Sequence, residues 1–144
     1  MGKLFGSDIM AQSNYREWWN SLPEAWKTIF REQEFKGKVV DPTDEDLSTF
    51  NNITNINCAG NKDIETLKPL AFLARLEYID CSNTNIRSLE GIEDLKNLRI
   101  INCSNNDNIN SVVPCASLGN LQELNCGNTM VKSLQPLRGL TSLQ

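Results

Sequence analysis

Histidine is absent from this 144-residue sequence, which removes the commonest general base and the commonest zinc ligand. No run of about 18 apolar residues occurs, so the sequence predicts no membrane-spanning helix. Cys-x₂-Cys knuckles, phosphate-binding loops and dinucleotide-binding glycine patterns are also missing. These absences predict a protein that is not an enzyme and that holds no cofactor or metal ion.

The sequence has fewer basic than acidic residues, 14 Lys and Arg against 18 Asp and Glu. The formal net charge of -4 argues against nucleic acid or an anionic membrane as a partner. The first 20 residues lack the apolar core and the small-residue cleavage site of a secretory signal. Five cysteines, an odd number, indicate free thiols in a reducing compartment. We therefore predict a cytoplasmic protein.

The sequence does contain one short pattern four times, with apolar residues at its first and fourth positions and cysteine at its sixth. The copies are Ile53–Cys58, Leu76–Cys81, Leu98–Cys103 and Leu121–Cys126. Their cysteines are 23, 22 and 23 residues apart, a period that indicates a leucine-rich repeat array. The repeats occupy residues 53–75, 76–97, 98–120 and 121–142, and a fifth repeat starts at residue 143.

Each repeat predicts the same local structure. Alternating inward residues predict a short strand, and a polar corner residue follows it. The corner residues, whose side chains can bond backbone groups, are Asn61, Thr84, Asn106 and Thr129. Apolar residues then recur in steps of three, which favours 3₁₀ turns or brief helices. The residue before the third of these apolar positions is Pro69, Gly91, Pro114 or Pro136.

These repeats resemble the short, roughly 22-residue class of leucine-rich repeats in bacterial internalin-like and SDS22-like proteins. The cysteine followed by Ser-Asn or Gly-Asn also resembles repeats of Bacteroidetes proteins. The resemblance covers about residues 47–144, although threonine replaces asparagine at two of the four corners. It implies an α/β right-handed solenoid with a parallel β-sheet on its concave face and short helical turns on its convex face. It also implies a scaffold that binds another protein.

The part of the chain before the repeats predicts helices. We interpret residues 1–12 as a leader and residues 13–52 as a helical cap over the first repeat, which has no preceding neighbour. Apolar spacing predicts helices over 14–20 and 22–35, the second with a capping box from Ser21 to Glu24. A short strand is expected at 38–40.

A second capping box is predicted from Thr43 to Asp46. The acidic residues around it fit a helix N-terminus better than a calcium loop, which needs a glycine turn. Three tryptophans, Trp18, Trp19 and Trp26, are expected to cover the exposed end of the repeat core. The alternative is that they form an aromatic patch for a partner.

The cysteines admit a metal-binding, a redox and a structural interpretation. Cys58, Cys81, Cys103 and Cys126 occupy the alternating inward position of the strands, and Cys115 aligns with inward leucines. Thiols on adjacent strands form a line with steps of about 4.8 Å rather than surrounding a point. We therefore predict five free cysteines that pack in the core.

The strand residues that alternate with the inward ones predict the functional face. Repeat scaffolds bind partners on their concave surface. The candidate partner-binding residues are Asn55, Asn57, Tyr78, Asp80, Ile100, Asn102, Glu123 and Asn125. Tyr78 and Ile100 are the expected anchor pair. The alternative is a solvated face on which single exposed apolar residues carry no function.

The last repeat suggests a different role. Its apolar residues, together with Leu143, would face water unless something covers them. The sequence is therefore expected to be either a fragment of a longer array or a chain that forms homo-oligomers. The oligomer would use the edge around Leu134, Leu140 and Leu143.

Overall fold

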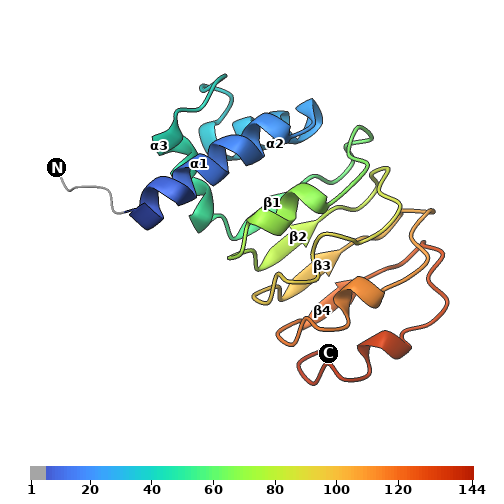
Figure 1. Cartoon of the computed structure of the whole chain (residues 1–144). Helices are drawn as coiled ribbons and strands as arrows, with labels where there is room; N and C mark the ends of the chain where they lie inside the picture. Colours follow the sequence, from blue (N-terminus) through green and yellow to red (C-terminus); the bar gives the residue numbers. More distant parts are fainter. Residues whose placement is uncertain (1–5) are drawn as a thin grey trace. The chain divides into compact units, whose positions relative to one another are not determined.

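The computed structural model describes the backbone of residues 6–144 and the side chains of residues 14–144. The chain forms two compact units, Met1–Asn51 and Asn52–Gln144 (Figure 1). The first unit is helical. The second unit winds through repeated strand and turn segments and carries the candidate site.

The first unit contains helices α1 (Gly6–Ser21), α2 (Glu24–Phe35) and α3 (Asp44–Ser48), followed by the 3₁₀ helix η1 (Thr49–Asn52). Helix α1 is longer than predicted, because it starts at Gly6 instead of residue 14. The interpretation of residues 1–12 as a leader stays a prediction, and residues 1–5 lie outside the described part. Helix α2 ends at a left-handed residue, Lys36, directly before the predicted stop at Gly37.

The two predicted capping boxes have different outcomes. The box at Thr43 is confirmed, because Thr43 Oγ1 accepts from Asp46 N and Asp46 Oδ2 accepts from Thr43 N. The box at Ser21 is wrong, because α1 continues through this residue and the Ser21 hydroxyl donates to the Trp18 carbonyl. Pro23 caps α2 instead, without a side-chain hydrogen bond.

Arg16 forms ion pairs with the acidic segment that leads into α3. Arg16 Nε donates to Asp44 at 2.7 Å, and its guanidinium also lies 3.8 Å from Asp41. The first turn of α3 contains Asp44, Glu45 and Asp46, as predicted. Their negative charges interact favourably with the positive end of the helix dipole. The strand expected at 38–40 does not form, because these residues make a loop between the helices.

The three tryptophans belong to an aromatic core of the first unit. Trp18 contacts Phe30 and Phe50 with ring centroids 5.3 and 5.8 Å apart, and Trp26 stacks on Phe30 at 5.6 Å. Trp19 and Trp26 are only 2% and 1% exposed. They therefore do not form an exposed aromatic patch. Their role in covering the first repeat stays a prediction.

The second unit contains a four-stranded parallel sheet in the order β1-β2-β3-β4. The strands are β1 (Asn55–Asn57), β2 (Tyr78–Asp80), β3 (Ile100–Asn102) and β4 (Glu123–Asn125). Equivalent residues pair without any shift, as Asn55 with Tyr78, Tyr78 with Ile100, and Ile100 with Glu123. The predicted strands and their register are confirmed.

The returning segments carry short 3₁₀ helices, η2 (Lys68–Phe72), η3 (Val113–Cys115) and η4 (Gln135–Leu137). Each has its predicted proline in the first turn, where the missing N–H costs little. The apolar residues in steps of three point inward, and those of the first three repeats are buried. Strand and turn residues together enclose one continuous apolar core.

Two of the four predicted polar corners, Thr84 and Asn106, are joined by buried hydrogen bonds. Asn106 Oδ1 accepts from Thr84 N at 3.0 Å, and Asn106 Nδ2 lies 2.9 Å from the carbonyl oxygens of both Cys81 and Cys103. Thr84 and Asn106 are only 4% and 2% exposed. An unpaired polar group at this depth costs about 1–3 kcal/mol, so these bonds make the buried corner possible.

The second repeat carries glycine instead of proline because there is no room for a side chain. Gly91 has a φ of +109°, and a Cβ atom there would lie 2.6 Å from Lys68 Cα of the preceding repeat. Both the backbone conformation and the close approach of the two repeats therefore require glycine.

We predict that Gly91→Ala lowers the free energy of unfolding by about 1–3 kcal/mol, because it introduces strain and a backbone clash. Urea denaturation followed by circular dichroism measures this change. Gly139→Ala is the matched control, because no atom lies within 4 Å of its Cβ position. The control should change stability by less than about 0.5 kcal/mol. Equal stability of both variants would contradict the close approach.

Candidate functional site

The open face of the sheet consists of the strand side chains that point away from the core. Its first row, one residue from each strand, is Asn55, Tyr78, Ile100 and Glu123. Its second row is Asn57, Asp80, Asn102 and Asn125. All eight predicted site residues lie on this face, and the residue between the two rows is buried in β1, β2 and β3.

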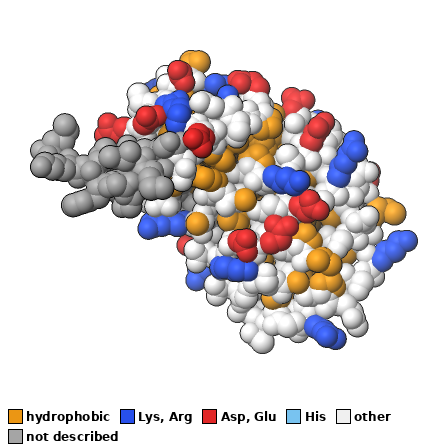
Figure 2. All heavy atoms as spheres, viewed as in Figure 1, with side chains coloured by type: hydrophobic (Ala, Val, Ile, Leu, Met, Phe, Trp, Pro, Cys, Tyr) orange, Lys and Arg blue, Asp and Glu red, His pale blue; other side chains and the backbone are white. Residues whose placement is uncertain are grey.

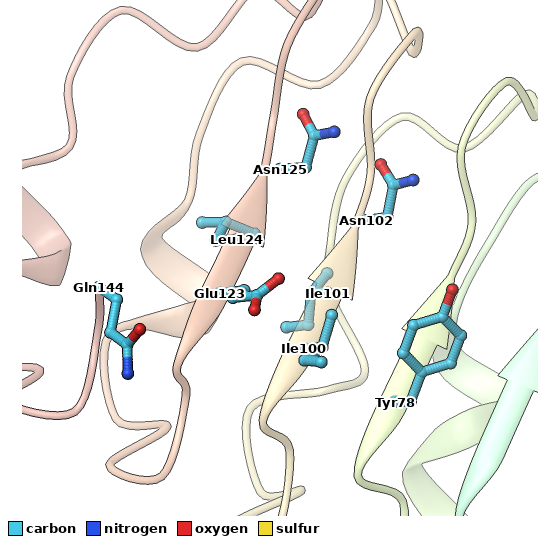
Figure 3. A pocket seen from close by; sticks show the side chains of 8 residues that line it. All are labelled: Tyr78, Ile100, Ile101, Asn102, Glu123, Leu124, Asn125 and Gln144. Carbon is cyan, nitrogen blue, oxygen red and sulfur yellow. The ribbon is translucent and has the colours of Figure 1, made fainter.

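A hollow of about 500 Å³ lies on the open face. It brings together five of the predicted residues, Tyr78, Ile100, Asn102, Glu123 and Asn125. Figure 3 shows Tyr78, Ile100 and Glu123 side by side on three successive strands. Asn55, Asn57 and Asp80 do not line the hollow. Ile101 and Leu124 also line the hollow, although Ile101 is fully buried and its side chain belongs to the core.

Three lining residues were not among the predicted site residues: Ile101 and Leu124, which the repeat pattern assigned to the inward positions, and Gln144, which sequence reasoning missed. Its backbone N–H donates to the Gln122 carbonyl at 2.9 Å, which holds it beside β4. Gln144 belongs to the row that immediately precedes the strands, with Arg99 and Gln122. The repeat period could have identified this row as part of the face.

The second row has a structural task that the sequence prediction did not assign. The Oδ1 atom of each member accepts a hydrogen bond from the backbone N–H two residues later, at 3.0–3.1 Å. Asp80 and Asn102 also accept from the hydroxyls of Ser82 and Ser104, at 2.7 and 2.8 Å. These Asx turns close the strand ends. One oxygen of each side chain is therefore committed to the fold.

The next polar row, Gly60, Asn83, Asn105 and Asn128, is also structural. Its members have φ values between 53° and 76°, a left-handed conformation that glycine and asparagine tolerate best. The asparagine richness of the repeats therefore serves the turns after the strands. The first row is the part of the open face that these turns do not use.

Tyr78 is the aromatic member of the first row. It is half-buried, and its hydroxyl donates to Asp80 Oδ2 over a long distance of 3.4 Å. Burial raises the pKa of the Tyr78 phenol, and the Asp80 carboxylate adds to this effect. The phenol therefore stays neutral near pH 7, and its ring presents apolar surface beside Ile100.

The cysteines do not belong to the open face. Cys58, Cys81, Cys103 and Cys115 are buried, all five cysteines are free, and Cys126 is half-buried. The expectation that Cys126 is buried is wrong, because β4 has a neighbouring strand on one side only in this sheet. Burial raises the pKa of the Cys58, Cys103 and Cys115 thiols to about 12.

In the part of the chain that the structure describes, no three side chains among His, Cys, Asp and Glu come together to hold a metal ion. None of the helices at residues 6–144 combines the length and the apolar character that crossing a membrane requires.

The last repeat is less exposed than predicted. Leu134 is 56% exposed as expected, but Leu137 and Leu140 are only 6% and 8% exposed. They are buried because η4 contacts η3 of the preceding repeat. Leu143 is half-buried. The expectation that all the apolar residues of this repeat face water is therefore wrong.

Comparison with protein families places the repeats in a known class. Residues 74–118 match the family described as "Leucine Rich repeats (2 copies)". Such domains generally mediate protein–protein interaction and are typically scaffolds rather than enzymes. Comparison with curated proteins gives no match.

Comparison with solved structures gives two internalins of Listeria monocytogenes. Internalin InlF has a TM-score of 0.70 and 24% identity over 83% of this chain and 34% of its own. Internalin C2 has a TM-score of 0.62 and 27% identity over 74% of this chain and 45% of its own. The chain thus spans less than half of either internalin, and the likeness supports the solenoid fold. The resemblance to Bacteroidetes repeats stays a prediction.

The buried thiols generate a prediction for alkaline pH. Below about pH 8.5 the thiols are protonated in both states, so they do not change stability. As pH rises from about 9 towards 12, the unfolded chain ionises while the folded thiols stay protonated. The free energy of unfolding should therefore fall by up to about 1.4 kcal/mol per pH unit for each such thiol.

Urea denaturation of the wild type and of Cys103→Ala at pH 8, 9 and 10 tests this dependence. The variant should lose stability less steeply with pH, because it lacks one buried thiol. Equal slopes would contradict the burial of Cys103. Rapid reaction of several cysteines with a thiol reagent in the native protein would contradict the buried ladder as a whole.

Proposed function

We propose that this chain is a protein-interaction module that binds a partner protein on the open face of its sheet. The observation that carries this proposal is the pairing of Tyr78 with Ile100 beside the 500 Å³ hollow. Their side chains lie on neighbouring strands, about 5 Å apart at Cβ, and both are half-buried. An aromatic next to an aliphatic residue in a hollow is a suitable anchor for a partner side chain.

The rest of the face supports this assignment. The asparagine side chains of the second row commit an oxygen to the turns but keep amide groups near the hollow at Asn102 and Asn125. An apolar centre with polar groups around it has the composition of a protein-binding surface. We place the module in a reducing, cytoplasmic compartment, because all five of its cysteines are free.

The alternative is a structural role, in which copies associate through the last repeat. The exposed side chains of Met130 and Leu134 favour it, at 52% and 56% exposure. Leu140 is buried, so it is not available at the predicted oligomer edge around Leu134, Leu140 and Leu143. The first proposal therefore has the stronger support.

We predict that Tyr78→Ala with Ile100→Ala weakens partner binding at least tenfold, because the two side chains form the anchor. The binding segment is selected from displayed fragments of the proteins of the source organism, and its affinity is measured by calorimetry. Val113→Ala with Met130→Ala is the matched control, because these apolar residues are exposed outside the open face.

A control that weakens binding as much as the face variant would contradict the proposal. Light scattering at several concentrations tests the alternative. A mass that rises with concentration and returns to that of one chain in Leu134→Asp, with no segment captured by the open face, would favour association of copies.

A further inference from the structure

We infer that the open face takes a basic and apolar segment of its partner, in which a Lys or Arg and an apolar residue are two positions apart. This inference rests on the proposed function, and it names the chemistry of the partner. Three observations support it: the negative charge of the open face, the Asx turn that Asp80 forms without needing its charge, and the position of Glu123 at the hollow.

Charge is distributed unevenly over the second unit. The two strand rows contain two acidic residues, Asp80 and Glu123, and no basic residue. The rest of residues 52–144 is balanced, with eight basic and seven acidic residues. Figure 2 likewise shows basic and acidic side chains interspersed over the visible face. The open face is therefore negative within a nearly neutral unit.

The basic residues nearby are engaged elsewhere. Arg99 pairs with Glu77 at 3.9 Å, and Lys62 Nζ donates to Asn83 at 2.7 Å. None of the ion pairs among the described residues involves Asp80 or Glu123. The carboxylate charges of the face are therefore available to a partner.

The charge of Asp80 is not needed for its structural task. Asparagine performs the same Asx turn in the other three strands, with oxygen-to-nitrogen distances of 3.0–3.1 Å. Asp80 Oδ1 makes the same bond at 3.0 Å. A neutral amide would therefore satisfy the fold at this position, and the negative charge is an additional property of the face.

Glu123 is an exposed carboxylate at the edge of the hollow. Its side chain makes no hydrogen bond or ion pair with any described residue. Figure 3 shows it on the strand next to Ile100, with Tyr78 one strand further. A cation that reaches Glu123 would thus belong to a segment whose apolar residue is seated against the anchor pair.

The strand spacing sets the distance between these two partner groups. A side chain seated between Tyr78 and Ile100 lies about 7 Å from Glu123, which is one and a half steps of ~4.8 Å. In an extended segment, residues i and i+2 point to the same side about 6.6 Å apart. An apolar residue and a Lys or Arg two positions apart, in either order, therefore fit the face.

The test uses the full chain and the segments selected from the displayed fragments. Affinities are measured for the wild type, Asp80→Asn, Glu123→Gln and the double variant at low and high salt. Each single change should weaken binding about three- to tenfold, and raising the salt should weaken binding by the wild type more than by the double variant. Asp80→Asn keeps the Asx turn, so the fold is preserved.

Glu65→Gln is the matched control, because Glu65 is exposed and lies outside the open face. It should bind like the wild type. Replacing the Lys or Arg of the segment with Gln should cost less in Glu123→Gln than in the wild type, since the pair is then already broken.

Selected segments without a basic residue, or unchanged affinity in the double variant, would overturn the inference. If the Tyr78 and Ile100 variant still loses binding in that case, the proposed function stands and only the partner chemistry is wrong. If neither the anchor variant nor the charge variants change binding, the proposed function itself fails.

Discussion

The unshifted pairing of the four strands is the constraint on which the rest of the structure depends. Side chains alternate along a strand, so a slip of one residue would turn Ile79 and Cys81 towards solvent and Asp80 into the core. The buried bonds between Thr84 and Asn106 oppose such a slip, because each has its partner only in this register. The register therefore decides both which residues form the core and which residues reach the open face.

The sequence was sufficient to predict the repeats, the strands and the two rows of the open face, because a period of 22 or 23 residues assigns each position to an environment. It was less informative where no period exists. Ser21 has the residue pattern of a helix cap, yet it is the last residue of α1 and its hydroxyl donates to the Trp18 carbonyl. Local patterns decide helix ends only when tertiary contacts do not.

The functional meaning of the rows could be predicted only in part. Asn57, Asn102 and Asn125 were expected to contact a partner, but their oxygens close the strand ends. That role depends on the direction in which the backbone leaves each strand, which cannot be predicted directly from the sequence. The second row therefore supports the scaffold, while Tyr78, Ile100 and Glu123 line the hollow without taking part in these turns.

The central claim is that recognition belongs to the open face. Methyl nuclear magnetic resonance on protein labelled at isoleucine and valine, titrated with a selected segment, tests it most directly. Our account predicts that the Ile100 methyl signals shift most and saturate with the segment, while those of the exposed Val40 and Val113 stay in place. Larger shifts at Val40 or Val113 than at Ile100 would contradict it.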